Sequence, residues 1–347
     1  MERKLNIKKV IITGVILVII IAIVLFINYK VQRKKLNKKL ETAQHAITLN
    51  ENVDLYKNKK AKKSLTKLEI GANIYILEDS IEENGKILSK VYAENKVGFV
   101  LKEEISSYKS TDDKKVLMLD VSKFNMKSSF RTIGEFKAFI LKNDIKYIYI
   151  RIAGRGYGKK GILYEDEYFK KYSEACEFME VPFGYYYIDE AITSDEIKEE
   201  TEIIEELLKN NIYKFNKLPL AIDVENHDGQ GRADSIFEER CDLVNELIKN
   251  LNDKNINTIV YSNAKIADKY LENVKSYLWL AYYPKLTNIP TYWYSETNQD
   301  PAKNQKIIKR MIGWQFTETG VETKINEEVD LSIVYNEFFK KYCNSSR

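Results

Sequence analysis

Eight short β-type segments, rich in aliphatic and aromatic residues, follow one another between residues 112 and 345. Amphipathic helical patterns lie between the earlier ones, at 169–179, 195–209 and 235–251. Strands that alternate with helices predict an α/β domain with parallel β/α units, and eight units predict a (β/α)8-type, TIM-like barrel. Because the later connections are short or irregular, this barrel is expected to lack some outer helices. The expected strands are 116–122, 147–153, 181–189, 218–225, 258–263, 277–283, 312–317 and 329–334.

The N-terminal part of the chain contains a run from Val10 to Ile27 in which only Thr13 and Gly14 are not apolar. About 18–20 helical residues cross a hydrocarbon core of ~30 Å, and the run lacks the polar stripe of a soluble core helix. The sequence therefore predicts a transmembrane helix over 10–28, between a short tail (1–9) and a basic juxtamembrane linker (29–48). A cleaved signal peptide is the alternative, although no small-x-small cleavage site follows the run.

The charge of the chain is unevenly distributed. Ten Lys and Arg against two Asp and Glu give residues 1–48 a charge of +8, whereas the other 299 residues carry 45 basic and 49 acidic side chains, a charge of −4. The slightly acidic main part argues against a nucleic-acid partner. A simple count of the flanking charges favours an intracellular large domain, but large domains translocate despite such charge, so function must decide the orientation.

Three cysteines and two histidines supply no disulfide framework or typical zinc site, and neither a metal nor a cofactor is expected.

Residues 49–108 are expected to form a small all-β barrel, because several segments alternate apolar and polar residues with period two. The expected strands are 53–56, 72–77, 87–92 and 97–100. Leu68-x-x-Gly71 and Val97-Gly98-Phe99-Val100 resemble bacterial SH3-like domains that accompany cell-wall enzymes, with Phe99 at the family's usual Trp. The resemblance implies wall binding, and a structural spacer is the alternative.

Chemistry in (β/α)8 barrels lies at the C-terminal ends of the strands. The expected ends carry several carboxylates beside tyrosines, a tryptophan and an arginine. Buried carboxylates are costly unless they are paired, so such a cluster needs a function. These side chains are Asp120, Arg151, Tyr186, Asp189, Asp223, Glu225, Tyr261, Asn263, Tyr282, Trp314 and Gln315, and Asp330 lies at the start of the last expected strand.

Asp223-Val224-Glu225 is the sharpest local signal. Residues i and i+2 of a strand point to the same face, so both carboxylates are expected to project into the barrel mouth. Asp120 and Asp330, on the first and last strands, become neighbours when the barrel closes. Like charges raise a pKa and keep one acid protonated near neutral pH, and paired acids of this kind cleave glycosidic bonds. Each carboxylate alone has another interpretation, as a strand-end or loop cap.

At these positions the domain resembles glycoside hydrolase family 25, the N-acetylmuramidases (lysozymes) of bacteria and their phages. The family usually continues its first motif with Gln-Gly and a Trp, whereas Lys123-Phe124-Asn125-Met126 follow here, which leaves part of the specificity open. The matching motifs keep the family's order: Leu119-Asp120-Val121-Ser122, Ile150-Arg151-Ile152-Ala153-Gly154, Asp166, Val181-Pro182-Phe183-Gly184-Tyr185-Tyr186, Asp223-Val224-Glu225, Tyr261-Ser262-Asn263, Trp279-Leu280-Ala281-Tyr282, Trp314-Gln315-Phe316-Thr317 and Val329-Asp330-Leu331-Ser332.

The resemblance implies a role for each matching residue. Glu225 would be the general acid, and Asp223 would orient the 2-acetamido group of the substrate or stabilise positive charge near the anomeric carbon. Asp120 and Asp330 would complete an acidic floor. Whether the enzyme retains or inverts the anomeric configuration depends on the separation of the carboxyl groups. Further substrate contacts are expected from Tyr186, Tyr282, Trp314, Gln315, Arg151 and Asn263.

The sequence thus predicts a membrane-anchored N-acetylmuramidase that cleaves the β-1,4 bond between N-acetylmuramic acid and N-acetylglucosamine in bacterial peptidoglycan. Its catalytic domain is expected on the extracellular, cell-wall side of a single-pass cell membrane protein. Two alternatives remain open: a catalytically inactive barrel that only binds peptidoglycan, and a hydrolase of another N-acetylhexosamine polymer such as chitin.

Overall fold

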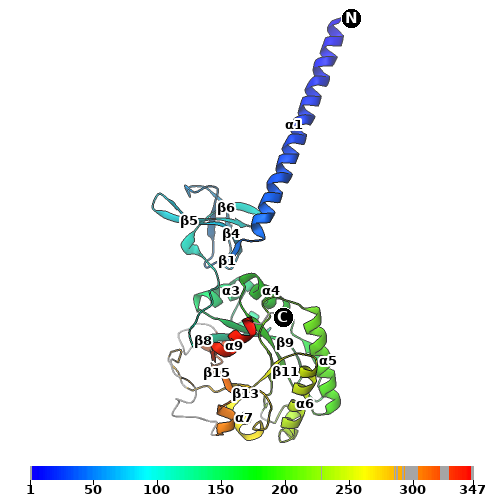
Figure 1. Ribbon diagram of the computed structural model, residues 1–347, viewed down its shortest axis with the longest axis vertical. Helices are drawn as coiled ribbons and strands as arrows, with labels where there is room; N and C mark the ends of the chain where they lie inside the picture. The colour runs from blue at the N-terminus through cyan, green and yellow to red at the C-terminus, as the bar shows by residue number, and fades with distance from the viewer. Residues whose placement is uncertain are drawn as a thin grey trace. The chain divides into compact units, whose positions relative to one another are not determined.

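The computed structural model describes residues 2–227, 229–284, 286, 288–290, 293, 304–320 and 328–344, and the side chains among them from residue 9 onward. The chain forms two compact units (Figure 1). The first contains residues 1–46, 54–67 and 74–103, and the second contains the rest. A long helix and most of a small sheet belong to the first unit, and a barrel belongs to the second.

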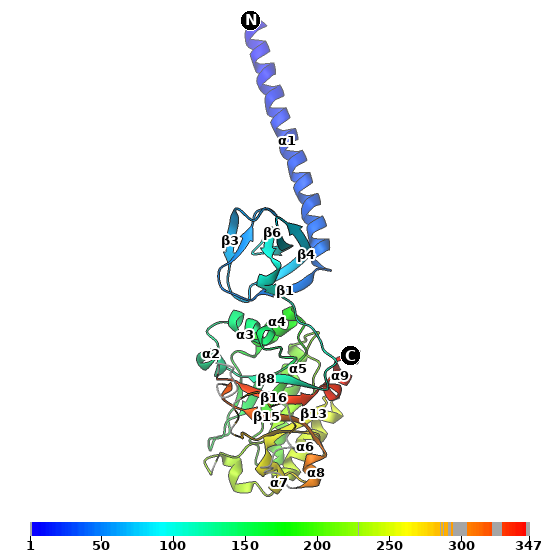
Figure 2. The ribbon, with the colours of Figure 1, turned by 90° about the vertical axis from the view of Figure 1, so that its left-hand side faces the viewer.

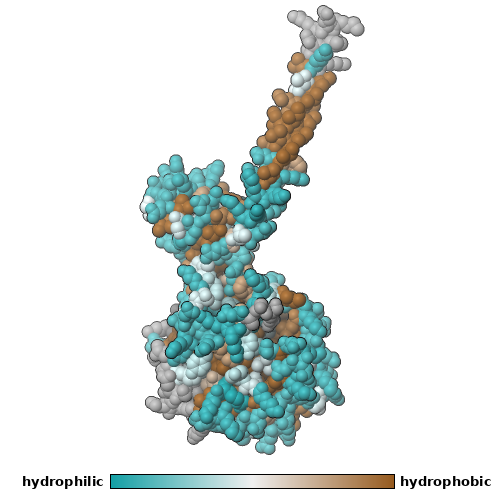
Figure 3. All heavy atoms as spheres, in the orientation of Figure 1, coloured by the Kyte–Doolittle hydropathy of each residue, from teal (hydrophilic) through white to brown (hydrophobic). Residues whose placement is uncertain are grey.

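Helix α1 (Glu2–Leu40) contains the apolar run. Its large apolar side chains between Val10 and Ile27 are 49–70% exposed, so this is not a core helix. Figure 3 shows the hydrophobic surface along the middle of the helix. Among the described residues one helical segment, Lys9–Leu40, is long and apolar enough to cross a membrane, although a signal sequence meets the same criterion.

The small sheet has seven strands in the order β3-β2-β6-β5-β4-β1-β7. Asn84 and Gly85 join β4 to β5 with φ of 51° and 73°, which is the geometry of a two-residue hairpin turn that favours Asn-Gly. The four expected strands correspond to β2, β4, β5 and β6, whereas β1, β3 and β7 lacked a clear sequence pattern. The strands are β1 (Gln44–Thr48), β2 (Val53–Tyr56), β3 (Ser64–Leu68), β4 (Asn73–Glu83), β5 (Lys86–Ala93), β6 (Lys96–Leu101) and β7 (Ile105–Ser106).

Eight strands close into a barrel in the second unit, since each pairs with the next and β8 pairs with β9. All eight segments expected from the sequence are strands. A short additional strand, β10 (Leu163–Glu165), pairs antiparallel with β9 and was not predicted. The barrel strands are β8 (Lys115–Val121), β9 (Tyr147–Arg155), β11 (Phe183–Ile188), β12 (Leu220–Asp223), β13 (Thr258–Asn263), β14 (Leu278–Ala281), β15 (Met311–Thr317) and β16 (Asp330–Tyr335).

The prediction of an all-parallel barrel is wrong at β16. This strand runs antiparallel to both β15 and β8 (Figure 2). Antiparallel neighbours need no crossover helix, which agrees with the irregular sequence before Asp330. Because β16 is reversed, its first residue lies at the edge where the parallel strands end, and Asp330 is paired directly with Asp120.

The outer helices are short in the later part of the barrel. Helices α5 and α6 have 17 and 14 residues, whereas α7 and α8 have 7 and 4. Thr132 and Thr193 cap α3 and α5 by accepting hydrogen bonds from backbone N–H groups of the first turn. The helices are α2 (Asn125–Ser128), α3 (Ile133–Lys142), α4 (Phe169–Met179), α5 (Ser194–Asn210), α6 (Arg240–Asp253), α7 (Ala264–Tyr270), α8 (Gln305–Ile308) and α9 (Asn336–Asn344), with 3-10 turns at Lys102–Glu104 and Arg232–Ile236.

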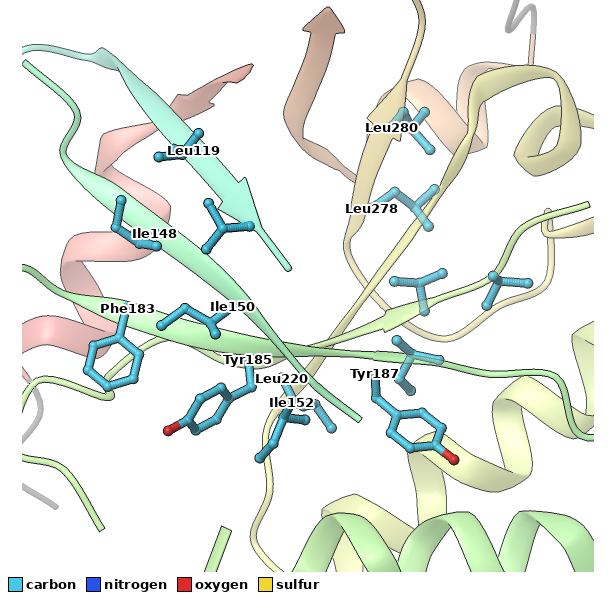
Figure 4. Packing of buried hydrophobic residues seen from close by; sticks show 14 of the residues in the cluster. Leu119, Ile148, Ile150, Ile152, Phe183, Tyr185, Tyr187, Leu220, Leu278 and Leu280 are labelled. Atoms are coloured by element: carbon cyan, nitrogen blue, oxygen red, sulfur yellow. The ribbon is translucent and has the colours of Figure 1, made fainter. Parts of the chain in front are cut away.

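Side chains alternate across the barrel wall. Outward-facing residues such as Ile148, Ile150 and Leu280 pack with the outer helices (Figure 4). Inward-facing residues such as Tyr149 and Trp279 form a second buried cluster that also contains Phe339 of α9. Because the alternation has period two, only every other residue at a strand end reaches the barrel mouth.

Candidate active site

A cavity of about 230 Å³ lies at the C-terminal ends of the parallel strands. Seven of the ten residues to which the sequence assigns a catalytic or substrate-binding role line it, and five of its lining residues are carboxylates. A second cavity, of about 310 Å³, is lined by residues such as Leu218 and Asn257 at the other ends of the strands, and no carboxylate lines it. The site chemistry therefore belongs to the smaller cavity. Its lining residues are Asp120, Arg151, Tyr186, Ile188, Asp223, Glu225, Tyr261, Trp279, Tyr283, Gln315, Glu318 and Asp330.

The backbone beyond β12 places Glu225 beside Asp223. The strand ends at Asp223, two residues before the expected end. Pairing with β13 nevertheless continues, since the Val224 N–H donates to the Tyr261 carbonyl (3.0 Å) and the Ser262 hydroxyl donates to the Val224 carbonyl (2.7 Å). Val224 is thereby held facing outward, and both carboxylates line the cavity.

Gln315 organises the floor of the cavity. Its Nε2 donates to Asp120 Oδ2 (2.9 Å), and its Oε1 accepts from the hydroxyls of Tyr261 (2.7 Å) and Tyr283 (2.6 Å). The side chain is buried. Two donors on one oxygen fix the orientation of the amide, so its N–H must face the carboxylate.

Arg151 is the only cation that lines the cavity among the described residues. Its Nε donates to Asp166 Oδ2 (2.8 Å), and its Nη2 lies 2.7 Å from the same oxygen. Asp166 is fully buried and also accepts from the backbone N–H groups of Lys123 and Tyr168. Much of the charge of Arg151 is therefore balanced outside the cavity, which stays strongly acidic.

Burial and mutual repulsion favour the protonated forms of the cavity acids. Burial raises the pKa of Asp120 and Asp223 well above the usual range, and the charges of Asp330 and Glu225, respectively, add to it. Burial, with Glu318 and Glu225, raises the pKa of Asp330 to about 7. Burial also raises the pKa of Glu225. The cluster therefore retains protons near neutral pH, as a general acid requires.

One acceptor atom in the cavity lacks a partner. Asp223 Oδ1 is buried and has no hydrogen bond to any residue that the structure describes. An unpaired buried carboxylate oxygen is costly, so it marks a position where a ligand can donate a hydrogen bond. No group of three or more His, Cys, Asp or Glu side chains within the described segments has a geometry that could hold a metal ion.

Three of these ten residues do not line the cavity, and neither does Asp189, which forms a buried ion pair with Arg240. Trp314 is fully buried on the outward face of β15, and its Nε1 donates to the Tyr282 carbonyl (2.9 Å). Tyr282 packs against the same outer core, and Asn263 caps α7 by accepting from the Lys265 N–H (2.9 Å).

The cavity also contains Tyr261, which was expected at a strand end but given no role, and Trp279 and Tyr283, which were not expected at the site. Each occupies an inward position of the period-two alternation, so the strand pattern contained the signal. Ile188 also fits this pattern, whereas Glu318 follows the end of β15 and no periodicity identifies it.

The sequence matches the family model "Glycosyl hydrolases family 25" over residues 119–325, more than half of the chain. The chain belongs to glycosyl hydrolase family 25. The matched segment contains Asp120, Asp223 and Glu225, and Asp330 lies just beyond it.

The solved structures that match the chain share little sequence with it. The modular autolysin LytC from Streptococcus pneumoniae is 19% identical over 77% of this chain and 57% of its own, with a TM-score of 0.48. The spore cortex lytic enzyme SleM from Clostridium perfringens is 19% identical over 65% and 69%, with a TM-score of 0.47. The catalytic domain of endolysin ply40 from bacteriophage P40 of Listeria monocytogenes is 17% identical over 68% and 100%, with a TM-score of 0.47. The chain thus spans less than two thirds of LytC, and no curated protein matches it in sequence.

Proposed function

We propose that the chain is a peptidoglycan hydrolase, an N-acetylmuramidase that cleaves the β-1,4 bond between N-acetylmuramic acid and N-acetylglucosamine. The observation that carries the proposal is the pair of carboxylates Asp223 and Glu225, both in one acidic cavity and both with raised pKa values. Membership of glycosyl hydrolase family 25 supports the reaction class. Release of new reducing ends from purified peptidoglycan tests the proposal, and a wild-type protein that releases none would contradict it.

Glu225 is the proposed general acid. It is half-buried, whereas Asp223 is buried, so Glu225 is the more accessible of the two to a glycosidic oxygen. Asp223 is proposed to accept the N–H of the 2-acetamido group through its partnerless Oδ1. With Asp330 and the Gln315-bound Asp120 nearby, carboxylates also surround positive charge that develops on the sugar ring.

Two neighbours shift the pKa of Glu225 in opposite directions. The charge on His227 lowers it and the charge on Glu318 raises it. Because a general acid must be protonated, activity falls as the pH rises through this pKa. His227→Gln removes the imidazole whose positive charge lowers this pKa and is expected to move the alkaline limb of kcat/KM to higher pH.

Glu318→Gln is the matched variant, and it is expected to move the same limb to lower pH. The measurement is the pH profile of kcat/KM on a soluble glycan. Shifts in the same direction, or no shift in either variant, would contradict the assignment of this limb to Glu225.

We further propose that residues 10–28 anchor the protein in the cell membrane with the barrel on the wall side. The support is the exposed apolar helix of sufficient length, and the location that a peptidoglycan substrate requires. The full-length protein is expected to remain with membranes through an alkaline carbonate wash. Recovery of a shortened soluble form would identify the helix as a signal sequence instead.

A further inference from the structure

A hairpin with a basic tip projects from the barrel beside the cavity. Strands β9 and β10 pair antiparallel, and residues 156–162 join them. The Gly156 N–H donates to the Ile162 carbonyl (3.0 Å), and the Gly161 N–H donates to the Gly158 carbonyl (2.9 Å). Residues 157–160 are exposed, and they include Lys159 and Lys160. Neither lysine has an ion pair with any residue that the structure describes.

Two arginines hold this hairpin, the buried Arg155 and the half-buried Arg232. Arg155 Nη1 donates to the Gly161 carbonyl (2.8 Å), and its Nε donates to the buried Glu200 (2.8 Å). The Arg232 N–H donates to the Tyr157 carbonyl (2.9 Å), and a Cβ at Gly161 would lie 2.2 Å from the Arg232 guanidinium. Gly161 also has a φ of 52°, so glycine is required there. A tip fixed in advance loses little conformational entropy when it binds.

The hairpin contacts the segment that carries the proposed general acid. The ring of Tyr157 is 5.0 Å from the ring of His227, with an angle of 32° between their planes. His227 follows Glu225 by two residues, and its Nε2 lies 3.1 Å from the buried Glu190. A glycan held in the cavity therefore passes close to the hairpin.

The charge of the tip is opposite to that of the cavity. Five carboxylates line the cavity, and its single arginine is paired with Asp166. Within the described part of the chain, the cavity lining therefore offers no unpaired cation to the carboxylates that the peptide stems of peptidoglycan carry. Lys159 and Lys160 supply positive charge at the hairpin, and the exposed face of Tyr157 adds apolar contact area.

We propose that Lys159, Lys160 and Tyr157 form a binding site for the carboxylates of a peptide stem attached to the glycan strand in the cavity. The inference rests on the proposed function, since it assigns a preference for stem-bearing over stem-free glycan. The site contributes to substrate affinity and not to the chemical step.

The test compares glycan strands that carry their stems with strands from which an amidase has removed them. The wild type is expected to have a lower KM for the stem-bearing glycan. The double variant Lys159→Glu/Lys160→Glu is expected to raise this KM about tenfold with little change in kcat, and to leave the stem-free KM unchanged. The control is Lys249→Glu/Lys275→Glu, which reverses two exposed lysines away from the cavity ends of the strands.

Equal effects of the double variant on both substrates, or no effect on either, would overturn the proposal. If the double variant loses affinity only for walls that retain phosphate polymers, the lysines bind phosphate instead, and the proposal is also overturned. Binding of soluble muramyl peptides to Glu225→Gln, with and without the lysine reversals, needs no turnover. This binding measurement separates failure of the stem site from failure of the proposed function.

Discussion

Glu225→Gln is expected to reduce the rate of peptidoglycan hydrolysis at least ~100-fold, as removal of a general acid does. Gln has nearly the same shape as Glu but cannot donate the proton that the leaving oxygen needs. Burial raises the pKa of Glu225, so the wild-type side chain retains this proton at higher pH than an exposed Glu. The measurement is the initial rate of reducing-end release at saturating substrate.

The matched control is Glu206→Gln, on the exposed face of α5. It is expected to keep the wild-type rate, and both variants should unfold at about the wild-type temperature. Near-normal turnover by folded Glu225→Gln would remove Glu225 from the general-acid role.

Arg240→Met is expected to lower the free energy of unfolding by about 3–5 kcal/mol, the range for breaking a buried ion pair from one side. Arg240 and Asp189 are both fully buried, and Arg240 Nη2 donates to Asp189 Oδ2 (3.0 Å). The same guanidinium donates to the carbonyls of Asp189 and Ala191 (both 2.7 Å). Truncation therefore leaves a buried carboxylate and two carbonyls without these donors, in the loop that carries Glu190.

Urea unfolding of two control variants tests whether the loss of stability comes from breaking the buried ion pair. Lys254→Met breaks a more exposed pair with Glu205 and is expected to cost less than about 1 kcal/mol. Arg240→Met/Asp189→Asn removes both charges and is expected to recover part of the loss. A similar cost for Arg240→Met and Lys254→Met would contradict the importance of the buried pair.

The period-two pattern explains which site residues the sequence could predict. Asp120, Asp223 and Gln315 occupy inward positions at strand ends, and all three line the cavity. Trp314 and Tyr282 were expected there as well, although each precedes an inward residue and must face outward when the strand is regular. When the alternation is applied to every strand end, it predicts Tyr283 in the cavity and Tyr282 on the outer face.

The position of Asp330 depends on long-range pairing that no local pattern encodes. A parallel last strand would place its first residue at the end of the barrel away from the cavity. The reversal of β16 brings Asp330 opposite Asp120. The strands of the small sheet were similarly predictable where they alternate, and its wall binding stays a prediction.

The most direct test of the account is mass spectrometry of the products formed from purified peptidoglycan by the full-length protein, with Glu225→Gln in parallel. Fragments with new N-acetylmuramic acid reducing ends are expected from the wild type, and none are expected from the variant. Intact glycan with the protein bound to it would instead identify a peptidoglycan-binding scaffold and contradict the account.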